Sequence, residues 1–308
     1  MVLAAPHSMP ALPGKLARER LPTSASLRLQ VQSSNAVRGG EAPARARLSN
    51  FLRDGISSYE QNHDLPGIDG TSRLSPYLHL GCLSPREIEQ RLPDGSGVEA
   101  FRRQLCWRDF FHHVLRHFPE NRDKEFQVRY RGTLRWSRER RLFVAWCEGK
   151  TGYPLVDAGM RQLIAEGWMH NRVRMVVGSF LTKDLGIDWR WGEQHFMRCL
   201  IDGDEANNNC NWQWIASVGV DPQPVFKRIL NPTLQQRRFD PDGSYVRRYL
   251  PELKPLPQEL LPEPWKMSTS LQHELGCVIG RDYPAPIVDH AQARREALER
   301  YRTTSKPS

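Results

Sequence analysis

The sequence predicts a mainly α protein. Apolar residues recur at helical spacing in one segment after another, as Ala44, Leu48, Phe51 and Leu52 do in the first. No strand-like alternation of useful length occurs after residue 40, and no internal repeat is found. With 308 residues and 39% apolar content, the chain can bury a sizeable core in one large domain or two ordinary ones.

The composition narrows the class of protein. The net charge of +9 suits a polyanionic partner such as nucleic acid, although many basic proteins bind none. The six cysteines show no CxxC pair or other ligand spacing, so neither a zinc site nor an iron–sulfur cluster is expected. They are typical of small, mostly buried thiols in a reducing compartment. No apolar run approaches the ~20 residues of a membrane span, so no membrane partner is expected.

Residues 1–40 have the composition of a disordered or remnant segment. They lack an apolar period and, up to residue 38, contain a single acid, Glu19. No continuous apolar stretch follows a charged start, which argues against a secretory signal. The basic, acid-poor character loosely fits an organelle transit peptide. We expect a cytoplasmic protein, nucleoid-associated if bacterial, and leave organelle targeting open.

The first part of the ordered chain predicts two helices with a polar loop between them. One helix runs from Glu41 to near Gly55, and another starts at Pro85 with Ser84 as its N-cap. In the loop, residues 71–75 offer three hydroxyls, a guanidinium and backbone N–H groups, a set that could hold a phosphate. The plainer alternative is an ordinary helix cap, since Ser or Thr before an apolar run usually has that role.

The rest of the chain predicts further helices. They cover residues 98–118, 156–164, 168–185 and 244–250, and others begin within IDWRWGEQHF and near the C-terminus. The helix over 98–118 is amphipathic and basic, and we interpret His112, His113 and His117 as solvated residues rather than metal ligands. Residues 119–141 form a charged, irregular connection, and residues 301–308 form a tail.

The stretch IDGDEANNNCNWQW, residues 201–214, holds the densest set of polar and aromatic side chains. Its three consecutive asparagines are good caps and poor interior residues, so we expect a loop that ends in a helix start. Trp212 and Trp214 would face opposite sides of that helix, about 200° apart. The plainer alternative is a polar loop followed by two core tryptophans. If Arg174 is buried it needs an acid, and Asp202 or Asp204 is the natural candidate.

In this order, the segments resemble the FAD-binding half of the cryptochrome/photolyase family, most closely class I cyclobutane pyrimidine dimer (CPD) photolyases. The matching motifs are GTSRLSPYLHLGCLSP, QLCWRDFFHH, GKTGYPLVDAGMRQL, GWMHNRVRM, FLTKDLGIDWRWGE, IDGDEANNNCNWQWIAS, NPTLQQRRFDPDGSYVRRYLPEL and YPAPIVDH. Each motif is modest alone, but the ordered set over roughly residues 40–300 is highly specific. The resemblance implies an all-helical photolyase-type domain over residues 41–300 that holds FAD in a folded U-shape.

The resemblance also implies which residues hold the cofactor. The positions matching the FAD phosphate ligands are Tyr59, Thr71, Ser72, Arg73, Leu74 and Ser75. Arg174 and Asp202 match an ion pair beside the flavin ring, with Gly203 and Asp204 next to it. Asn208 matches the residue that faces flavin N5, a position that is Asn in photolyases and tends to differ in signalling cryptochromes. Asn208 therefore favours repair over signalling.

Three tryptophans match the family's electron relay. Trp136, Trp189 and Trp212 occupy the positions that carry an electron from the surface to the photoexcited flavin, and their spacings match without a gap. Spacing alone is equally compatible with three core tryptophans, which is the alternative.

A further group of residues matches the substrate site. Trp107 and Trp214 would stack on the flipped dimer, and Gln104, Asn171 and Met175 would hold it, because photolyases extrude the damaged base before acting on it. The positions expected to meet the DNA backbone or the cavity rim are Arg108, Arg172, Lys227 and Gln235.

Two departures from the family pattern affect the prediction. CPD photolyases usually have Glu where this chain has Gln104, which can donate a hydrogen bond but cannot act as an acid. A glutamine occurs there in (6-4) photolyases, which carry His where this chain has Asn171, so the CPD assignment stays ahead.

The second departure concerns the N-terminal part of the chain. About 40 residues cannot form the family's N-terminal antenna domain, which needs on the order of 100. No antenna chromophore is expected in this chain.

The sequence therefore predicts a monomeric carbon–carbon lyase that uses FAD and light to repair dimers in damaged DNA, with no metal. One alternative is a blue-light sensor that keeps the tryptophan relay without repair. Others are a (6-4) lesion photolyase, a fragment that cannot hold FAD, and a basic helical DNA-binding protein without a cofactor.

Overall fold

The computed structural model describes residues 22–23, 25–28, 33 and 35–304. In this part of the chain the regular structure is helical. Its β-structure consists of two isolated bridges, Ser137–Ile187 and Ile279–Tyr283. The predicted mainly α class is confirmed. None of the described helices has the length and apolar character needed to cross a membrane.

Fourteen α-helices lie within the described residues. In chain order they are α1 (Glu41–Asn50), α2 (Tyr59–Asn62), α3 (Ser75–His79), α4 (Pro85–Arg91), α5 (Ser96–His117), α6 (Arg140–Cys147), α7 (Pro154–Glu166), α8 (Asn171–Ser179), α9 (Trp189–Cys199), α10 (Glu205–Ile215), α11 (Pro232–Phe239), α12 (Ser244–Tyr249), α13 (Thr269–Glu274) and α14 (His290–Thr304). Two π-helical segments, η1 (Phe51–Gly55) and η4 (Phe180–Asp184), continue α1 and α8. Short 3-10 segments are η2 (Pro119–Arg122), η3 (Val128–Tyr130), η5 (Val225–Arg228), η6 (Pro251–Leu253) and η7 (Pro264–Lys266).

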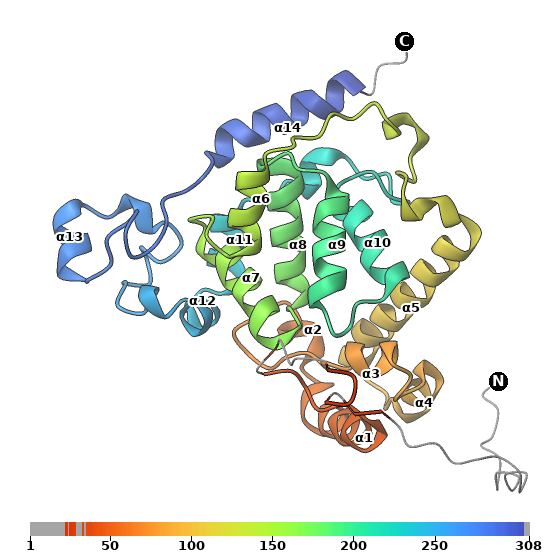
Figure 1. The fold of residues 1–308 in the computed structure, drawn as a ribbon. Coiled ribbons are helices and arrows are strands. Elements are labelled where there is room, and N and C mark those ends of the chain that lie inside the picture. The colour runs from red at the N-terminus through yellow and green to blue at the C-terminus, as the bar shows by residue number, and fades with distance from the viewer. Residues whose placement is uncertain (1–21, 24, 29–32, 34, 305–308) are drawn as a thin grey trace, which may run out of the picture.

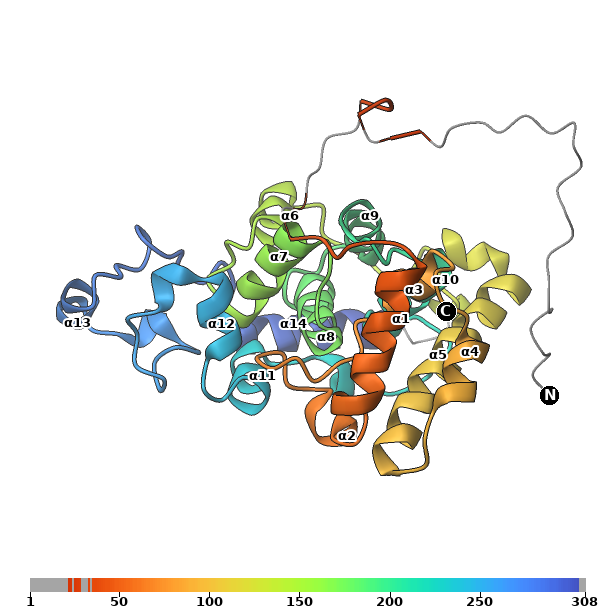
Figure 2. The same ribbon diagram turned by 90° about the horizontal axis from the view of Figure 1, so that it is seen from below.

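The middle of the molecule consists of α7, α8, α9 and α10 (Figure 1). Helix α5 lies on one side of this group and packs against α10, and α12 and α13 extend on the other side. The view from below shows α1 and α2 beside α5 (Figure 2). The central segment from α8 into η4 is fully buried at Val176, Val177, Phe180 and Leu181, so the large core is centred here.

Most predicted helix ends agree with the structure, but the start of α8 does not. Gly167 ends α7 with a φ of 62°, the left-handed geometry that glycine adopts most readily. The next helix begins at Asn171 instead of Trp168, because the His170 ring accepts a hydrogen bond from the Arg172 N–H and caps it. The predicted start was wrong because a histidine cap leaves no clear signal in the sequence.

The prediction for residues 201–214 was right about a loop that ends in a helix start and wrong about its cap. Asp204, not an asparagine, is the N-cap of α10, and its carboxylate accepts from the Asn207 N–H at 2.8 Å. An acid also suits the positive end of a helix. The asparagines then lie inside the helix, where Asn208 donates to the Glu193 carbonyl at 3.0 Å.

Both ends of the ordered region extend beyond the predicted boundaries. In the segment expected to be disordered, Asn35 N–H bonds the Ala165 carbonyl at 3.1 Å, and the Arg38 carbonyl accepts from Tyr77 Oη at 2.9 Å. Helix α14 runs to Thr304, and the side chain of Tyr301 is buried in the core, so the helix passes the expected boundary at residue 300. Of the predicted N-terminal segment and tail, residues 1–21, 24, 29–32, 34 and 305–308 lie outside the described residues.

Candidate functional site

A cavity of about 440 Å³ opens among α5, α8, α10 and the loop before α3. That volume falls within the ~300–1,000 Å³ of small-molecule and cofactor sites. The predicted site residues that line it are Tyr59, Thr71, Ser72, Arg73, Leu74, Ser75, Gln104, Trp107, Arg108, Asn171, Arg174, Met175, Asp202, Asp204 and Trp214. A smaller cavity of about 100 Å³ adjoins it and is lined by Asn208 and Trp212 as well as by Trp214.

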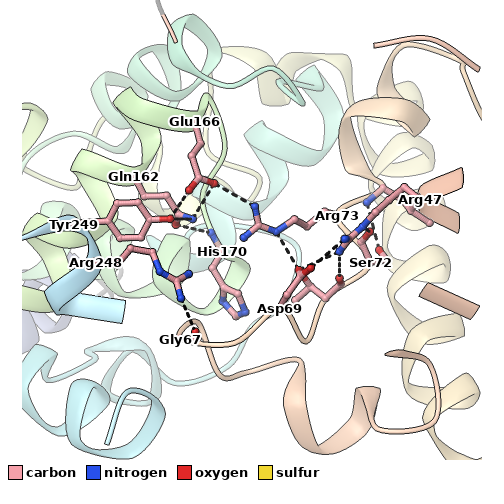
Figure 3. Close-up of polar contacts among 12 residues, drawn as sticks. Arg47, Gly67, Asp69, Ser72, Arg73, Gln162, Glu166, His170, Arg248 and Tyr249 are labelled. Carbon is pink, nitrogen blue, oxygen red and sulfur yellow. Dashed lines mark hydrogen bonds and ion pairs between the residues drawn. The ribbon is translucent and has the colours of Figure 1, made fainter. Parts of the chain in front are cut away.

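Arg47 holds the loop of residues 71–75 from the α1 side (Figure 3). Its Nε donates to the Ser72 carbonyl at 2.8 Å and its Nη2 to the Thr71 carbonyl at 2.9 Å. The same guanidinium makes two 3.0 Å contacts with the carboxylate of Asp69. Sequence reasoning missed Arg47, since it looks like an ordinary surface arginine of a helix.

Arg73 lies in this loop and lines the cavity, and its role as a phosphate ligand stays a prediction. Its φ of 51° is unusual for a residue other than glycine. The guanidinium is 3.3 Å from Asp69 and 3.2 Å from Glu166, and it lies over the Trp168 ring at 4.4 Å. Two carboxylates therefore balance the charge of Arg73, and the loop hydroxyls and main-chain N–H groups stay the other predicted phosphate donors.

Helices α7 and α12 hold the other side of the loop (Figure 3). Glu166 accepts from Tyr249 Oη as well as from Arg73, and Gln162 Nε2 donates to that same Oη at 3.0 Å. Arg248 Nη2 reaches the Gly67 carbonyl at 3.0 Å. The loop is thus fixed from three helices that are distant in sequence.

Arg174 and Asp202 form the expected ion pair at the cavity wall. Arg174 Nη2 is 3.1 and 2.9 Å from the two carboxylate oxygens, and its Nε donates to the Met169 carbonyl at 2.8 Å. The Asp202 side chain is 2% exposed and that of Arg174 is 24% exposed. The prediction that a buried Arg174 needs Asp202 or Asp204 is confirmed for Asp202. Gly203 follows in the turn and does not line either cavity.

Asp204 stays ionised beside two histidines. Burial alone would raise its pKa, but hydrogen bonds from Asn207 and the positive charges of His112 and Arg108 lower it below the ordinary value. His112 Nε2 lies 3.4 Å and His79 Nδ1 3.7 Å from this carboxylate. His112 was predicted to be solvated, and 41% of its side chain is exposed while its ring also contacts Asp204. Among the described residues, no group of three or more His, Cys, Asp or Glu side chains could hold a metal ion.

The substrate-side residues of α5 and α8 face the same cavity. On α5, Gln104, Trp107 and Arg108 lie at i, i+3 and i+4 and so share one face. Asn171 and Met175 are one turn apart on α8. The 47% exposed Trp107 leaves an aromatic face available at the opening of the cavity.

Trp214 is held by two residues that sequence reasoning missed. Its Nε1 donates to Asp221 Oδ2 at 3.1 Å, and the Arg228 guanidinium lies over its ring at 4.2 Å. Arg228 and Asp221 are themselves paired at 2.5 Å. These contacts fix the Trp214 indole at the cavity wall. They cross a loop, and no local sequence signal indicates them.

Three of the predicted DNA-contacting residues do not line either cavity. Arg172 pairs with Asp64 and lies over the Phe239 ring at 4.3 Å. Lys227 is exposed and donates to Gln223 at 3.1 Å, and Gln235 lies on α11. A role at the DNA backbone stays a prediction for them.

The three relay tryptophans follow one another through the fold. Trp212 and Trp189 are buried and Trp136 is half-buried. The Trp212 ring packs onto α9 at Gly192, where an added Cβ would lie 2.2 Å from it, and Trp189 is less than one turn away on that helix. An isolated bridge joins the residue after Trp136 to the residue two before Trp189. Their role in electron transfer stays a prediction.

His170 should make the stability of the folded protein depend on pH in the acid range. Burial, with a smaller effect of Arg73, Arg174 and Arg172, lowers its pKa from 6.5 to about 4, although Asp64 opposes the shift. The pKa of His170 is lower in the folded protein than in the unfolded chain. The contribution of neutral His170 to the free energy of unfolding is therefore complete above about pH 6.5 and is lost as the pH falls towards 4. Protonation also removes the acceptor that caps α8.

We therefore expect His170→Asn, which keeps a cap acceptor, to weaken the acid dependence. Urea unfolding between pH 4 and 6.5 measures it, with the wild-type free energy of unfolding falling more steeply than that of the variant. Equal slopes for the two proteins would contradict this role of His170.

The donor set suits FAD. Hydroxyls and main-chain N–H groups of residues 71–75 stand at one part of the cavity, where phosphates would be held. The Arg174–Asp202 pair and Asp204 provide donors and acceptors for the edge of a polar aromatic ring, and Leu78, Phe101 and Met169 add apolar walls. A bound flavin would supply light absorption and one-electron chemistry.

Comparison with known proteins agrees with this site. A family profile described as "FAD binding domain of DNA photolyase" matches residues 101–303. The chain is 49% identical over 263 residues to a deoxyribodipyrimidine photo-lyase of Alkalihalophilus pseudofirmus, covering 84% of this chain and 54% of the relative. For the protein of that name from Escherichia coli the identity is 44% over 273 residues, covering 86% and 56%.

Solved structures give the same assignment. A bacterial class III photolyase from Agrobacterium tumefaciens is 42% identical with a TM-score of 0.82, covering 87% of this chain and 56% of that one. A Synechocystis cryptochrome is 35% identical with a TM-score of 0.83, covering 92% and 61%. The chain spans about half the length of the curated relatives it matches. From the matching profile and these identities, the chain belongs to the FAD-binding-domain family of the DNA photolyases.

Proposed function

We propose that the protein is a light-dependent deoxyribodipyrimidine photolyase, a carbon–carbon lyase that repairs cyclobutane pyrimidine dimers in DNA. The observation that carries this proposal is that one cavity is lined both by the cofactor residues, such as Arg174 and Asp202, and by the lesion residues, such as Trp107 and Trp214. The names of the relatives support it. Bound FAD would supply the electron that opens the dimer.

The residues of the chain position the lesion. A damaged base pair is cheap to extrude, and the Trp107 and Trp214 rings would replace the stacking that the flipped bases lose. Amides of Gln104 and Asn171 would hydrogen-bond the pyrimidine carbonyls. Arg108 and the net charge of +9 would give a sequence-independent, salt-dependent affinity for the DNA backbone.

A repair assay tests the proposal. Protein with chemically reduced FAD is mixed with an oligonucleotide that carries one CPD, and the remaining dimer is quantified in blue light and in the dark. Loss of the dimer in light alone is expected. A protein that binds FAD and is photoreduced but leaves the dimer intact would instead be a light sensor.

Gln104 decides how well the cavity suits a CPD. An ionised glutamate at this position would accept a charge-assisted hydrogen bond from a pyrimidine N3–H, stronger by about 1 kcal/mol than the bond of the neutral amide, so Gln104→Glu should raise CPD repair roughly fivefold. Oligonucleotides with one CPD or one (6-4) lesion measure both activities, and Gln104→Leu is the control that loses the amide. Faster (6-4) than CPD repair by the wild type would overturn the CPD assignment.

We further propose that the protein acts as a monomer in the compartment that holds the DNA, the cytoplasm in a bacterial cell. Its basic surface suits direct encounter with DNA. Light scattering of the FAD-loaded protein tests the oligomeric state, since a mass of about twice 35.6 kDa would reject the monomer.

A further inference from the structure

Four exposed arginines flank Trp136 on the connection that leads into α6. Residues 135–141 read RWSRERR and contain one acid, Glu139. The four residues, called the arginine cluster below, are Arg135, Arg138, Arg140 and Arg141. Within the part of the chain that the structure describes, none of them forms an ion pair or a side-chain hydrogen bond. Their positive charges are therefore available to a ligand from solution.

The segment that carries the cluster is held in place beside an accessible indole. The Ser137 N–H donates to the Gly186 carbonyl at 2.8 Å, which ties the connection to the residues before α9. Trp136 is half-buried, with the Tyr301 ring edge-on at 6.5 Å and the Arg300 guanidinium 5.7 Å from its centroid. The part of the indole that α14 leaves uncovered therefore lies on the same fixed segment as the arginine cluster.

The charges of the cluster do not help the local fold. Helix α6 begins at Arg140 and has no acid in its first turn, so Arg140 and Arg141 lie at the positive end of the helix dipole. Positive side chains destabilise that end, and no acid among the described residues compensates them. Charges that break a local rule without compensation indicate a function, which for arginines is the binding of an anion.

The position and size of the cluster favour a small anion over DNA or a protein. The cluster lines neither cavity. Trp136 packs on α14, and Figure 1 shows α14 on the opposite side of the central helices from α1, α2 and α3, which lie near the loop of residues 71–75. DNA whose lesion enters the cavity would therefore meet another side of the molecule. A stable protein interface takes about 20–30 residues a side, far more than this segment of seven.

We propose that the arginine cluster binds a small anionic reductant, such as a thiol that carries a carboxylate, which returns an electron to Trp136. The inference rests on the proposed function, because it takes Trp136 as the surface end of the electron relay. The oxidised, deprotonated indole regains one electron and its N–H proton from the S–H group. The reductant leaves as a thiyl radical, and two such radicals combine into a disulfide.

Three thiols of different charge test the proposal on the full FAD-loaded chain. Mercaptopropionate is an anion, mercaptoethanol is neutral and cysteamine is a cation, and all three react through the same S–H group. The rate of flavin photoreduction should saturate with mercaptopropionate and rise linearly with the other two thiols. Added salt should slow the anionic thiol and speed the cationic one, because it screens the cluster.

Reversing two charges of the cluster should reverse this preference. Arg140→Glu/Arg141→Glu should lower the ratio of the anionic to the cationic rate about tenfold. Both side chains are exposed and glutamate suits the first turn of a helix, so the variant should fold. The matched control, Arg86→Glu/Arg103→Glu, makes the same charge change at exposed, unpaired arginines of α4 and α5 and should keep the wild-type ratio. An unchanged ratio in Arg140→Glu/Arg141→Glu, or an equal fall in the control, would overturn the proposal.

Fluorescence quenching gives a readout that needs no electron transfer to the flavin. Iodide and acrylamide both quench tryptophan, but only iodide is charged, and Trp136→Phe identifies the share of quenching that belongs to Trp136. In Arg140→Glu/Arg141→Glu this share should fall for iodide and stay constant for acrylamide, and equal iodide quenching in the two proteins would reject the anion site. If iodide behaves as expected but none of the three thiols supports photoreduction of the wild type, Trp136 is not the surface end of a relay, and the reductant role fails with it.

Discussion

Replacing Trp212 with phenylalanine is expected to abolish light-driven reduction of oxidised flavin while leaving repair by chemically reduced protein intact. Trp212 lines the smaller cavity together with Asn208 and packs on Phe196, so its ring is a buried aromatic donor beside the residue predicted to face flavin N5. Phenylalanine keeps an aromatic ring but leaves part of the buried indole space empty, at a stability cost of about 2 kcal/mol, and its ring is far harder to oxidise. Absorbance changes under blue light with a thiol measure the reduction rate, which should fall at least about a hundredfold.

Trp214 provides the matched control on the same helix. It lines the cavity from the other side of α10 and is held by Asp221 and Arg228. Trp214→Phe should leave photoreduction unchanged and weaken binding of CPD-containing DNA by about 1 kcal/mol, because a smaller ring stacks less well. The relay assignment fails if Trp212→Phe is reduced at the wild-type rate, and the lesion assignment fails if Trp214→Phe binds damaged DNA normally.

The fold was predictable because helical periodicity and local caps carry most of the information. Ser84 caps α4 by accepting from the Arg86 N–H, and Gly167 ends α7, both as their sequence context indicates. The caps of α8 and α10 were not predicted, because histidine is not among the usual capping residues and because Asp204 competes with nearby asparagines of equal capping tendency. His170 gains its advantage only from the buried setting that keeps it neutral.

The predicted site is partly local and partly a product of tertiary structure. The Arg174–Asp202 pair could be anticipated, because a buried cation requires an acid and the motif offers Asp202 and Asp204 as natural candidates. Arg47 and Glu166 could not, since they act on the loop of residues 71–75 from helices far away in the sequence. The same holds for Arg228 beneath Trp214. Contacts of this kind depend on the register of helix packing, which no local pattern encodes.

Removing the guanidinium of Arg174 should have the largest effect on the folded site. In Arg174→Met the Asp202 carboxylate, 2% exposed, loses its only ion-pair partner among the described residues. An uncompensated buried charge costs about 3 kcal/mol or more, a large part of the 5–15 kcal/mol that stabilises a typical domain. The same change removes a cation from the cavity wall, so the purified variant is expected to be colourless. Urea unfolding and the flavin released on denaturation measure the two effects.

The two residues of the Arg174–Asp202 ion pair should differ in how much stability is lost when each is replaced. In Asp202→Asn the neutral amide oxygen still accepts from Arg174, whose Nε also keeps the Met169 carbonyl, so the cost should be only about 1 kcal/mol. Asp202→Asn also removes the buried carboxylate charge that Arg174→Met leaves unpaired. The double variant Arg174→Met/Asp202→Asn should therefore be more stable than Arg174→Met alone. Such a coupling is expected only of residues in direct contact. If the double variant is instead as unstable as the sum of the single changes, Asp202 does not depend on Arg174 for its burial. Retention of FAD in Arg174→Met would separately show that the pair does not hold the flavin.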